Sequence, residues 1–147
     1  MTITSTAFQN DEEIPREYGF DGRNVNPPLT FSEVTSEAKS LALILEDPDA
    51  PGGVFVHWIL YSMSPATLQV LEGELPRGAK QATNDYGTVG YGGPRSPSGT
   101  HRYVFKLFAL DDLLDELRAT DGREAFYEAV EGHILDEAVI TGLFEAA

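Results

Sequence analysis

Polar and apolar side chains alternate through Arg102–Leu110 (RYVFKLFAL), and this alternation is the feature that most restricts how the chain can fold. Successive side chains of an extended strand point to opposite faces of its sheet. One face would carry Tyr103, Phe105, Leu107 and Ala109; the other would carry Arg102, Val104, Lys106 and Phe108. A strand of this kind needs a second layer to cover its apolar face.

Three further segments are rich in apolar, β-branched or aromatic residues and are predicted to be strands. They are Ser40–Glu46 (SLALILE), Val54–Ser62 (VFVHWILYS) and Ala138–Phe144 (AVITGLF). The first is continuously apolar, which is typical of a buried central strand. The chain has 14 glycines and 9 prolines, which recur throughout and suit a turn-rich β architecture.

Helical signals appear late in the chain. Asp121 followed by Glu124 forms a capping-box pattern, and Gly132 is expected to weaken or end the helix that it begins. The apolar positions at helical spacing are Phe126, Val130 and Ile134. A shorter helix is predicted over 111–118 (DDLLDELR). With 147 residues, close to one average domain, we expect a single domain over 1–147: a mostly β sandwich with peripheral helices.

The composition excludes several classes of protein. The chain has no cysteine, which rules out disulfides, thiolate zinc sites and cysteine catalysis. Its longest apolar run, Val54–Tyr61, is interrupted by His57 and is too short to cross a bilayer. The first residues (MTITSTAFQNDEE) show neither a basic end nor an apolar stretch, so we expect no signal peptide and a soluble, cytoplasmic protein.

The formal charge of −14 is unevenly distributed. Residues 1–75 carry 12 acidic and 3 basic side chains (−9), residues 76–110 carry 1 and 5 (+4), and residues 111–147 carry 11 and 2 (−9). The total argues against binding to nucleic acid or an anionic membrane. The central segment is either a chance grouping of solvated side chains or a local attraction for an anionic ligand. The acidic, lysine-poor composition also predicts a halophilic protein.

Chemically useful side chains gather in two segments. In 46–58 (EDPDAPGGVFVHW) prolines end the strand just after Asp47 and Asp49, and His57 follows on the next strand. In 89–105 (VGYGGPRSPSGTHRYVF) a glycine-rich loop leads to His101 and Tyr103 on one face of a strand. The loop could offer its backbone N–H groups to an anion. For His133, at the end of the predicted helix, a capping or packing role is expected.

Taken together, the two segments resemble the signature motifs of the phosphatidylethanolamine-binding protein (PEBP) family, in its bacterial and archaeal branch often called Raf-kinase-inhibitor-like. The resembling motifs are DPDAP with the following HW, and GYGGP with SGTHRYVF. The stretches PREYGFDGRNVNPPLTF and EAFYEAVEGHILDEAVITGLF are also similar to that branch, so the resemblance covers nearly the whole chain.

The resemblance implies a PEBP-like antiparallel β-sandwich, with a large central sheet, a smaller sheet and peripheral α-helices. It also implies a pocket for phosphate or a phospholipid head group. The ligand-binding residues carried over from the motifs are Asp47, Pro51, Phe55, His57, Gly90, Gly92, Pro94, His101 and Tyr103.

Roles follow from the chemistry of these groups. The glycine N–H groups, the Tyr103 hydroxyl and protonated imidazoles would donate to the anion, and Asp47 would orient one imidazole. Asp49 and Arg102 are expected to form a supporting ion pair. The chain departs from the family where Phe31 and Phe55 replace frequent tryptophans and where Arg95 replaces a common cysteine.

We therefore expect a non-catalytic protein that binds a small anion, without metal, cofactor or integral membrane contact. One alternative is a module that inhibits a kinase or protease, because relatives include such inhibitors. Another is a phosphoester hydrolase, in which two histidines and Asp47 bind a metal or act as acid and base. Relatives in this branch are often dimers, which makes a homodimer a further expectation.

Overall fold

Two sheets make up the fold in this computed structural model, which describes residues 1–146. The elements in chain order are β1 (Thr2–Thr4), β2 (Glu12–Glu13), the 3-10 helix η1 (Arg16–Tyr18), β3 (Leu29–Ser32), β4 (Ser40–Asp47), β5 (Phe55–Met63), β6 (Gln69–Val70), β7 (Lys80–Gln81), β8 (Thr100–Leu110), α1 (Arg123–Val130) and β9 (Ile134–Glu145). The small sheet has the order β1-β3-β6 and the large one β2-β9-β8-β4-β5-β7. The mostly β architecture with two sheets is the predicted one.

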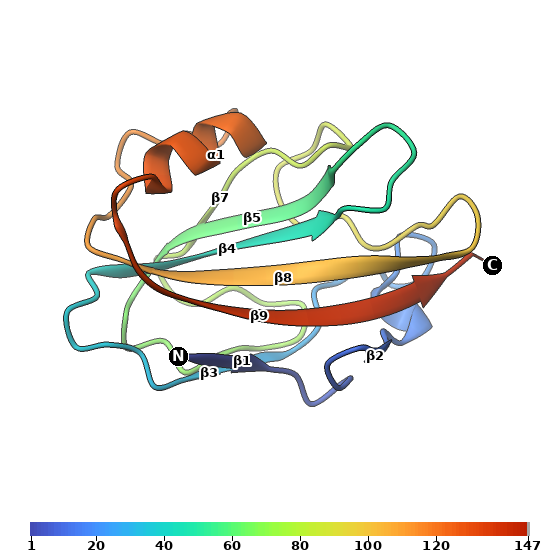
Figure 1. Ribbon diagram of the computed structural model, residues 1–147, viewed down its shortest axis with the longest axis horizontal. Helices are drawn as coiled ribbons and strands as arrows, with labels where there is room; N and C mark the ends of the chain where they lie inside the picture. The colour runs from blue at the N-terminus through green and yellow to red at the C-terminus, as the bar shows by residue number, and fades with distance from the viewer. Residues whose placement is uncertain (147) are drawn as a thin grey trace.

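The large sheet provides the frame for the rest of the molecule. Figure 1 shows β4, β5, β8 and β9 side by side, with α1 above them and β1 and β3 below. Neighbouring strands run antiparallel except at one edge, where the two-residue β2 pairs in parallel with β9. All eight residues of β4 are buried, as its continuous apolar sequence predicts for a central strand.

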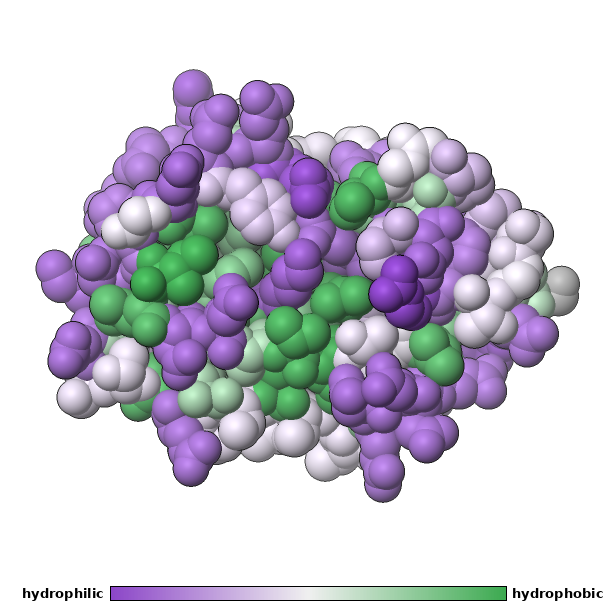
Figure 2. Space-filling model, viewed as in Figure 1, coloured by the Kyte–Doolittle hydropathy of each residue, from purple (hydrophilic) through white to green (hydrophobic). Residues whose placement is uncertain are grey.

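Each face of the large sheet has its own apolar core. The alternating residues of β8 predicted to share a face all lie in the core against the small sheet, beside Phe31, Leu43 and Trp58. The opposite face packs Ile44 and Phe108 against α1. Helix α1 does not cover the whole of that face: Val139 on β9 is 50% exposed, and apolar patches lie among hydrophilic side chains in Figure 2.

The helical predictions are only partly correct. Helix α1 begins at Arg123 after Gly122, without a side-chain cap, because the Asp121 carboxylate accepts from the backbone N–H of Arg118 instead. The prediction of a capping box formed by Asp121 and Glu124 is therefore wrong. Gly132 ends the helix as predicted, with a φ of +80°. Ile134 lies outside the helix, at the start of β9.

No helix forms over 111–118; bends, a turn at 115–116 and irregular backbone occupy this segment instead. Leu114 has a φ of +58°, in the left-handed region that interrupts a helix, and its side chain is fully buried in the core beneath α1. The burial of one leucine therefore overrides a locally helical sequence.

Among the described residues, no helix has the length and apolar character that crossing a membrane requires.

Candidate functional site

The two motifs meet at one end of the large sheet. Asp47 ends β4, Phe55 lies opposite it at the start of β5, and His101 lies at the start of β8. β4 is antiparallel to both neighbours, so its last residue lies beside their first residues. A cavity of about 210 Å³ opens there, lined by Asp47, Ala50, Pro51, Phe55, His57, Tyr86, Arg95 and Pro97.

His57 is held at this cavity by the backbone. Its side chain is buried, and Nδ1 lies 2.7 Å from the carbonyl oxygen of Gly92. Burial lowers the pKa of His57, against the opposing effects of the Gly92 carbonyl and the Asp47 carboxylate. The neutral imidazole is therefore favoured, whereas the sequence interpretation has His57 donating to an anion as a cation. The rings of Phe55 and Tyr86 lie 4.9 and 5.5 Å from the imidazole.

Asp47 orients the other imidazole. Its Oδ2 lies 2.7 Å from Nδ1 of His101, and its Oδ1 accepts from the Asp49 N–H at 2.8 Å. Both side chains of the Asp47–His101 pair are almost fully buried. His101 does not line the cavity itself, so its contact with the cavity runs through Asp47.

The glycine loop does not form the predicted anion nest. The N–H of Gly90 donates to Ala82, that of Gly92 to the backbone oxygen of His57, and that of Gly93 to Asn24 Oδ1. These groups are engaged within the protein, so they stabilise the loop instead of facing a ligand. Pro94 is engaged as well, since its carbonyl oxygen accepts from Phe20.

Tyr103 is also less available than predicted. It is fully buried, and its hydroxyl lies 3.0 Å from Ser96 Oγ. Ser96 donates its one hydroxyl hydrogen to the carbonyl of Phe144, so in this pair Tyr103 is the donor. Burial raises the pKa of Tyr103 to about 12. The hydroxyl hydrogen is thus directed into the protein.

The cations of segment 76–110 are largely paired with acids from its flanks. Arg102 forms a bidentate pair with Asp49, with donor–acceptor distances of 2.8 and 3.0 Å. Lys106 lies 2.9 Å from Glu46. Arg95 makes a looser pair with Asp21 at 3.5 Å, and its side chain is 57% exposed. Arg102 and Lys106 are therefore locally neutralised, whereas the loosely paired Arg95 lines the cavity.

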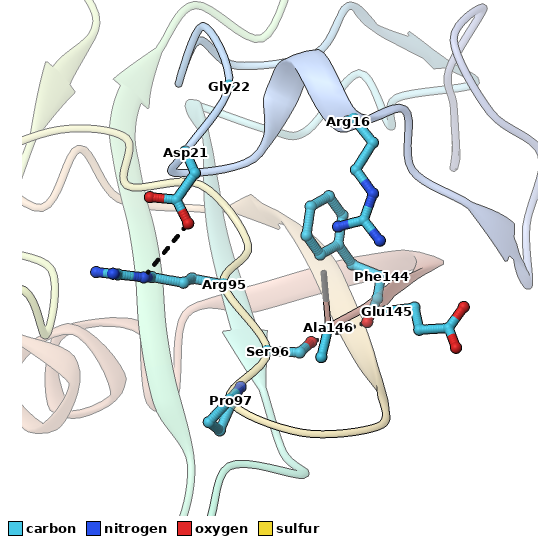
Figure 3. A pocket seen from close by; sticks show the side chains of 9 residues that line it. All are labelled: Arg16, Asp21, Gly22, Arg95, Ser96, Pro97, Phe144, Glu145 and Ala146. Atoms are coloured by element: carbon cyan, nitrogen blue, oxygen red, sulfur yellow. Dashed lines mark hydrogen bonds and ion pairs between the residues drawn. The ribbon is translucent and has the colours of Figure 1, made fainter.

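A second, larger cavity adjoins the first and shares Arg95 and Pro97 with it. It measures about 440 Å³ and is shown in Figure 3, where Arg95 extends to Asp21. The Arg16 guanidinium lies over the ring of Phe144, 4.4 Å from its centroid. The sequence motifs did not indicate this cavity, because its residues come from three separate segments of the chain.

The sequence reasoning also missed Tyr86 as a wall of the first cavity. Its backbone N–H donates to Asn84 Oδ1 and its hydroxyl to the Gly93 carbonyl. The sequence feature that could have indicated Tyr86 is the turn at Asn84, which presents this tyrosine and lies between the two motifs.

His133 lies elsewhere, hydrogen-bonded to Asp111. No group of His, Asp or Glu side chains suited to a metal ion occurs within residues 1–146.

Fold and site together define a class: a two-sheet, mostly β protein with a small, mostly apolar cavity, edged by a few polar side chains, where the strands of its large sheet end. The family model described as phosphatidylethanolamine-binding protein matches residues 4–145. The chain belongs to the phosphatidylethanolamine-binding protein family.

Individual relatives agree with this assignment. The chain is 46% identical to a UPF0098 protein of Methanothermobacter thermautotrophicus, with 98% of both chains covered. It is 43% identical to a UPF0098 protein of Chlamydia muridarum, with 99% of both covered. Among solved structures, a phosphatidylethanolamine-binding protein homologue from Chlamydia trachomatis gives a TM-score of 0.93 at 40% identity, covering 99% of this chain and 97% of that one. YbcL from Escherichia coli gives 0.93 at 28% identity, with 99% and 98% covered.

Proposed function

We propose that this protein is a non-catalytic binding protein that takes a small phosphate-bearing ligand, such as phosphate or a phospholipid head group, in the cavity beside Asp47 and His57. The observation that carries the proposal is the cavity itself, with the Arg95 guanidinium among the groups that line it. Its volume of about 210 Å³ lies below the roughly 300–1,000 Å³ of sites for drug-sized molecules. A head group fits this space better than an acyl chain does.

Arg95 supplies the positive charge. A guanidinium binds phosphate oxygens well because its N–H groups form a planar fork. The distance of 3.5 Å to Asp21 and the exposure of the side chain leave Arg95 able to exchange that carboxylate for a ligand.

The lining of the cavity supports binding more than catalysis. It contains no serine, threonine, cysteine or lysine that could act as a nucleophile beside His57. Two further candidates are engaged: Asp47 accepts hydrogen bonds from His101 and Asp49, and the Tyr86 hydroxyl donates to the Gly93 carbonyl.

Titration with inorganic phosphate, followed by NMR of the histidine ring resonances, tests the proposal. Phosphate should shift the His57 resonances, and Arg95→Gln should weaken binding by about tenfold through loss of a charge-assisted contact. Arg118→Gln makes the same change in net charge at a residue that does not line the cavity, and it should bind as the parent protein does. The absence of any shift at His57, or equal weakening by both variants, would contradict the proposal.

A further inference from the structure

Helix α1 covers only part of the face of the large sheet on which it lies. The core beneath the helix contains residues of β4, β5 and β8, but none of β9 within the part of the chain that the structure describes. On this face Val139 of β9 lies opposite Lys106 and is 50% exposed, and Val104 of β8 is half-buried. A sheet face of this kind is stabilised when a second layer covers it, and α1 supplies that layer only over the other strands (Figure 1).

A groove of about 640 Å³ lies along the side of α1. Its apolar lining includes Val130 in the last turn of the helix and Ile134 at the start of β9, which is 43% exposed. Arg123 and Tyr127 line it as well, and both bind the buried carboxylate of Glu46, at 2.6 and 2.9 Å. These two side chains are therefore held in place before any partner arrives, which favours binding.

The rim of the groove is acidic. Glu124, Glu128 and Glu131 line it, and none of them forms an ion pair within residues 1–146. Among the described residues of the lining, the one cation is Arg123, and its charge is already paired with Glu46. The groove therefore has a negative potential that attracts cations.

Two of these carboxylates lie where the helix itself disfavours them. Glu128 is in the last turn of α1, and Glu131 directly follows this turn as the C-cap. The backbone carbonyl groups at this end form the negative pole of the helix, and the last turn contains no basic residue. Acidic side chains here destabilise the helix, whereas a bound cation would be attracted by the carboxylates and by the helix end together.

We propose that this groove, together with the exposed face of β9, binds a basic amphipathic helix of a partner protein. The partner helix would lie beside α1 and extend the helical layer over the sheet, at a site separate from the cavity proposed to bind phosphate. Its apolar stripe would pack on Ile134 and Val139, while flanking Lys or Arg side chains would face the acidic rim. A strand rises about 3.3 Å per residue, so these two anchors are about 16 Å apart and roughly three helical turns reach both. A second copy of this chain is a poorer occupant of this face, because it would bring the same carboxylates against those of the first.

Fluorescence anisotropy with a labelled synthetic peptide tests the proposal. The probe has about 15 residues, with leucine along one face of a helix and lysine on the other. One control peptide has the same residues in an order that breaks the leucine stripe, and a second has glutamate in place of lysine. In about 0.1 M KCl the probe should bind, the broken-stripe peptide should bind at least about tenfold more weakly, and the glutamate peptide should not bind. Equal binding of the probe and the broken-stripe peptide, or no binding of the probe, would overturn the proposal.

A matched pair of valine variants tests the apolar contact. Val139→Ser should weaken binding of the probe by about fivefold, because it removes an apolar anchor. Val89→Ser changes a valine that is 53% exposed and lies outside the groove, so it should bind as the parent protein does. Equal effects would contradict the proposed site. Sedimentation of the parent protein tests the other occupant: a dimer that Val139→Ser dissociates would assign this face to a second copy and overturn the proposal.

A matched pair of charge variants tests the acidic rim. The double variant Glu124→Gln/Glu128→Gln should weaken binding of the probe by about fivefold. Glu33→Gln/Glu37→Gln makes the same change in net charge in the segment between β3 and β4, outside the groove, and should weaken binding by less than about twofold. If both double variants weaken binding equally, the total charge of the protein attracts the peptide and the groove does not.

Discussion

The carboxylate of Asp47 and the imidazole of His101 lie 2.7 Å apart at the ends of neighbouring strands β4 and β8, and both side chains are buried. This contact joins residues 54 positions apart in the sequence and ties the two motifs together. It places His101 behind Asp47 as a support for the cavity wall. The pair therefore links the stability of the fold to the geometry of the site.

Removing one partner of this pair should destabilise the fold. His101→Ala leaves a buried carboxylate with only the Asp49 N–H as donor, and the free energy of unfolding should fall by about 3 kcal/mol. His101→Gln keeps an N–H donor and should lose less. Urea denaturation measures both. A stability for His101→Ala within about 0.5 kcal/mol of the parent would show that the pair is not structural.

Glu46 forms the second buried ionic cluster, on the face of the sheet under α1. It accepts from Arg123 at 2.6 Å and from the Tyr127 hydroxyl at 2.9 Å, and Lys106 lies 2.9 Å away. Burial raises the pKa of Glu46, but the hydrogen bonds from Arg123 and Lys106 outweigh it and hold the pKa below its ordinary value.

Glu46→Gln should therefore lower the free energy of unfolding by about 2–3 kcal/mol, because a charged acceptor shared by three donors is lost. Glu128→Gln, at an exposed position of α1, should change it by less than about 0.5 kcal/mol. Chemical denaturation of both variants gives the comparison. Equal effects would mean that the cluster adds nothing beyond surface charge.

The Asp49–Arg102 pair predicts a loss of stability in acid. Hydrogen bonds from Arg102 lower the pKa of Asp49 to about 2, below the value of about 3.9 for an unfolded aspartate. The pair therefore stabilises the fold above about pH 4 and loses this effect as the pH falls toward 2. Both side chains are partly exposed, so the contribution should stay below about 1 kcal/mol.

Urea unfolding of the parent and of Asp49→Asn at several pH values measures this contribution. The difference between the two proteins should be largest near neutral pH and should shrink below about pH 4. A difference that stays constant down to about pH 2.5 would show that the carboxylate charge is not involved.

The strands were predictable because their signal is local. The alternation in 102–110 and the apolar run in 40–46 each fix which side chains are buried without reference to the rest of the chain. The start of the helix and the conformation of segment 111–118 were not predictable, because packing against distant residues determines them. Leu114, for example, adopts a left-handed backbone conformation that is stabilised by the burial of its side chain in the core.

The candidate site, too, has features that were predictable from the sequence and features that were not. Asp47 and His57, which the motifs single out, line a common cavity because strand ends position them. The motifs could not show that the loop N–H groups are engaged, because one of the acceptors, Asn24, lies 69 residues away in the sequence. The direction of these hydrogen bonds depends on such long-range partners.

Gly92 should control the position of Tyr86. A Cβ at residue 92 would overlap the Tyr86 ring, which lines the cavity, whereas a Cβ at Gly52 would meet no atom within 4 Å. Gly92→Ala should weaken phosphate binding by about tenfold and destabilise the fold by about 1–3 kcal/mol through overpacking. Gly52→Ala should leave both unchanged. Parent-like binding by Gly92→Ala would show that Tyr86 can move without affecting the cavity.

Salt should stabilise this protein, because its charge of −14 is spread over the surface and not confined to a tail. Two effects compete. Concentrated salt weakens exposed pairs such as Asp49–Arg102, which contribute up to about 1 kcal/mol each. It also shortens the Debye length from about 10 Å at 0.1 M to about 3 Å at 1 M, which screens the repulsion among the surplus acids.

The repulsion should dominate, because 24 acidic side chains face only 10 basic ones and the buried Glu46 cluster is little affected by salt. We expect the melting temperature to be higher in about 2 M than in about 0.1 M KCl, by roughly 3–8 °C for a gain of about 1–2 kcal/mol. Using a chloride salt limits the general stabilisation that sulfate or phosphate salts give to any protein by exclusion from its surface. Equal melting temperatures at the two concentrations would show that the acidic surface is not an adaptation to salt.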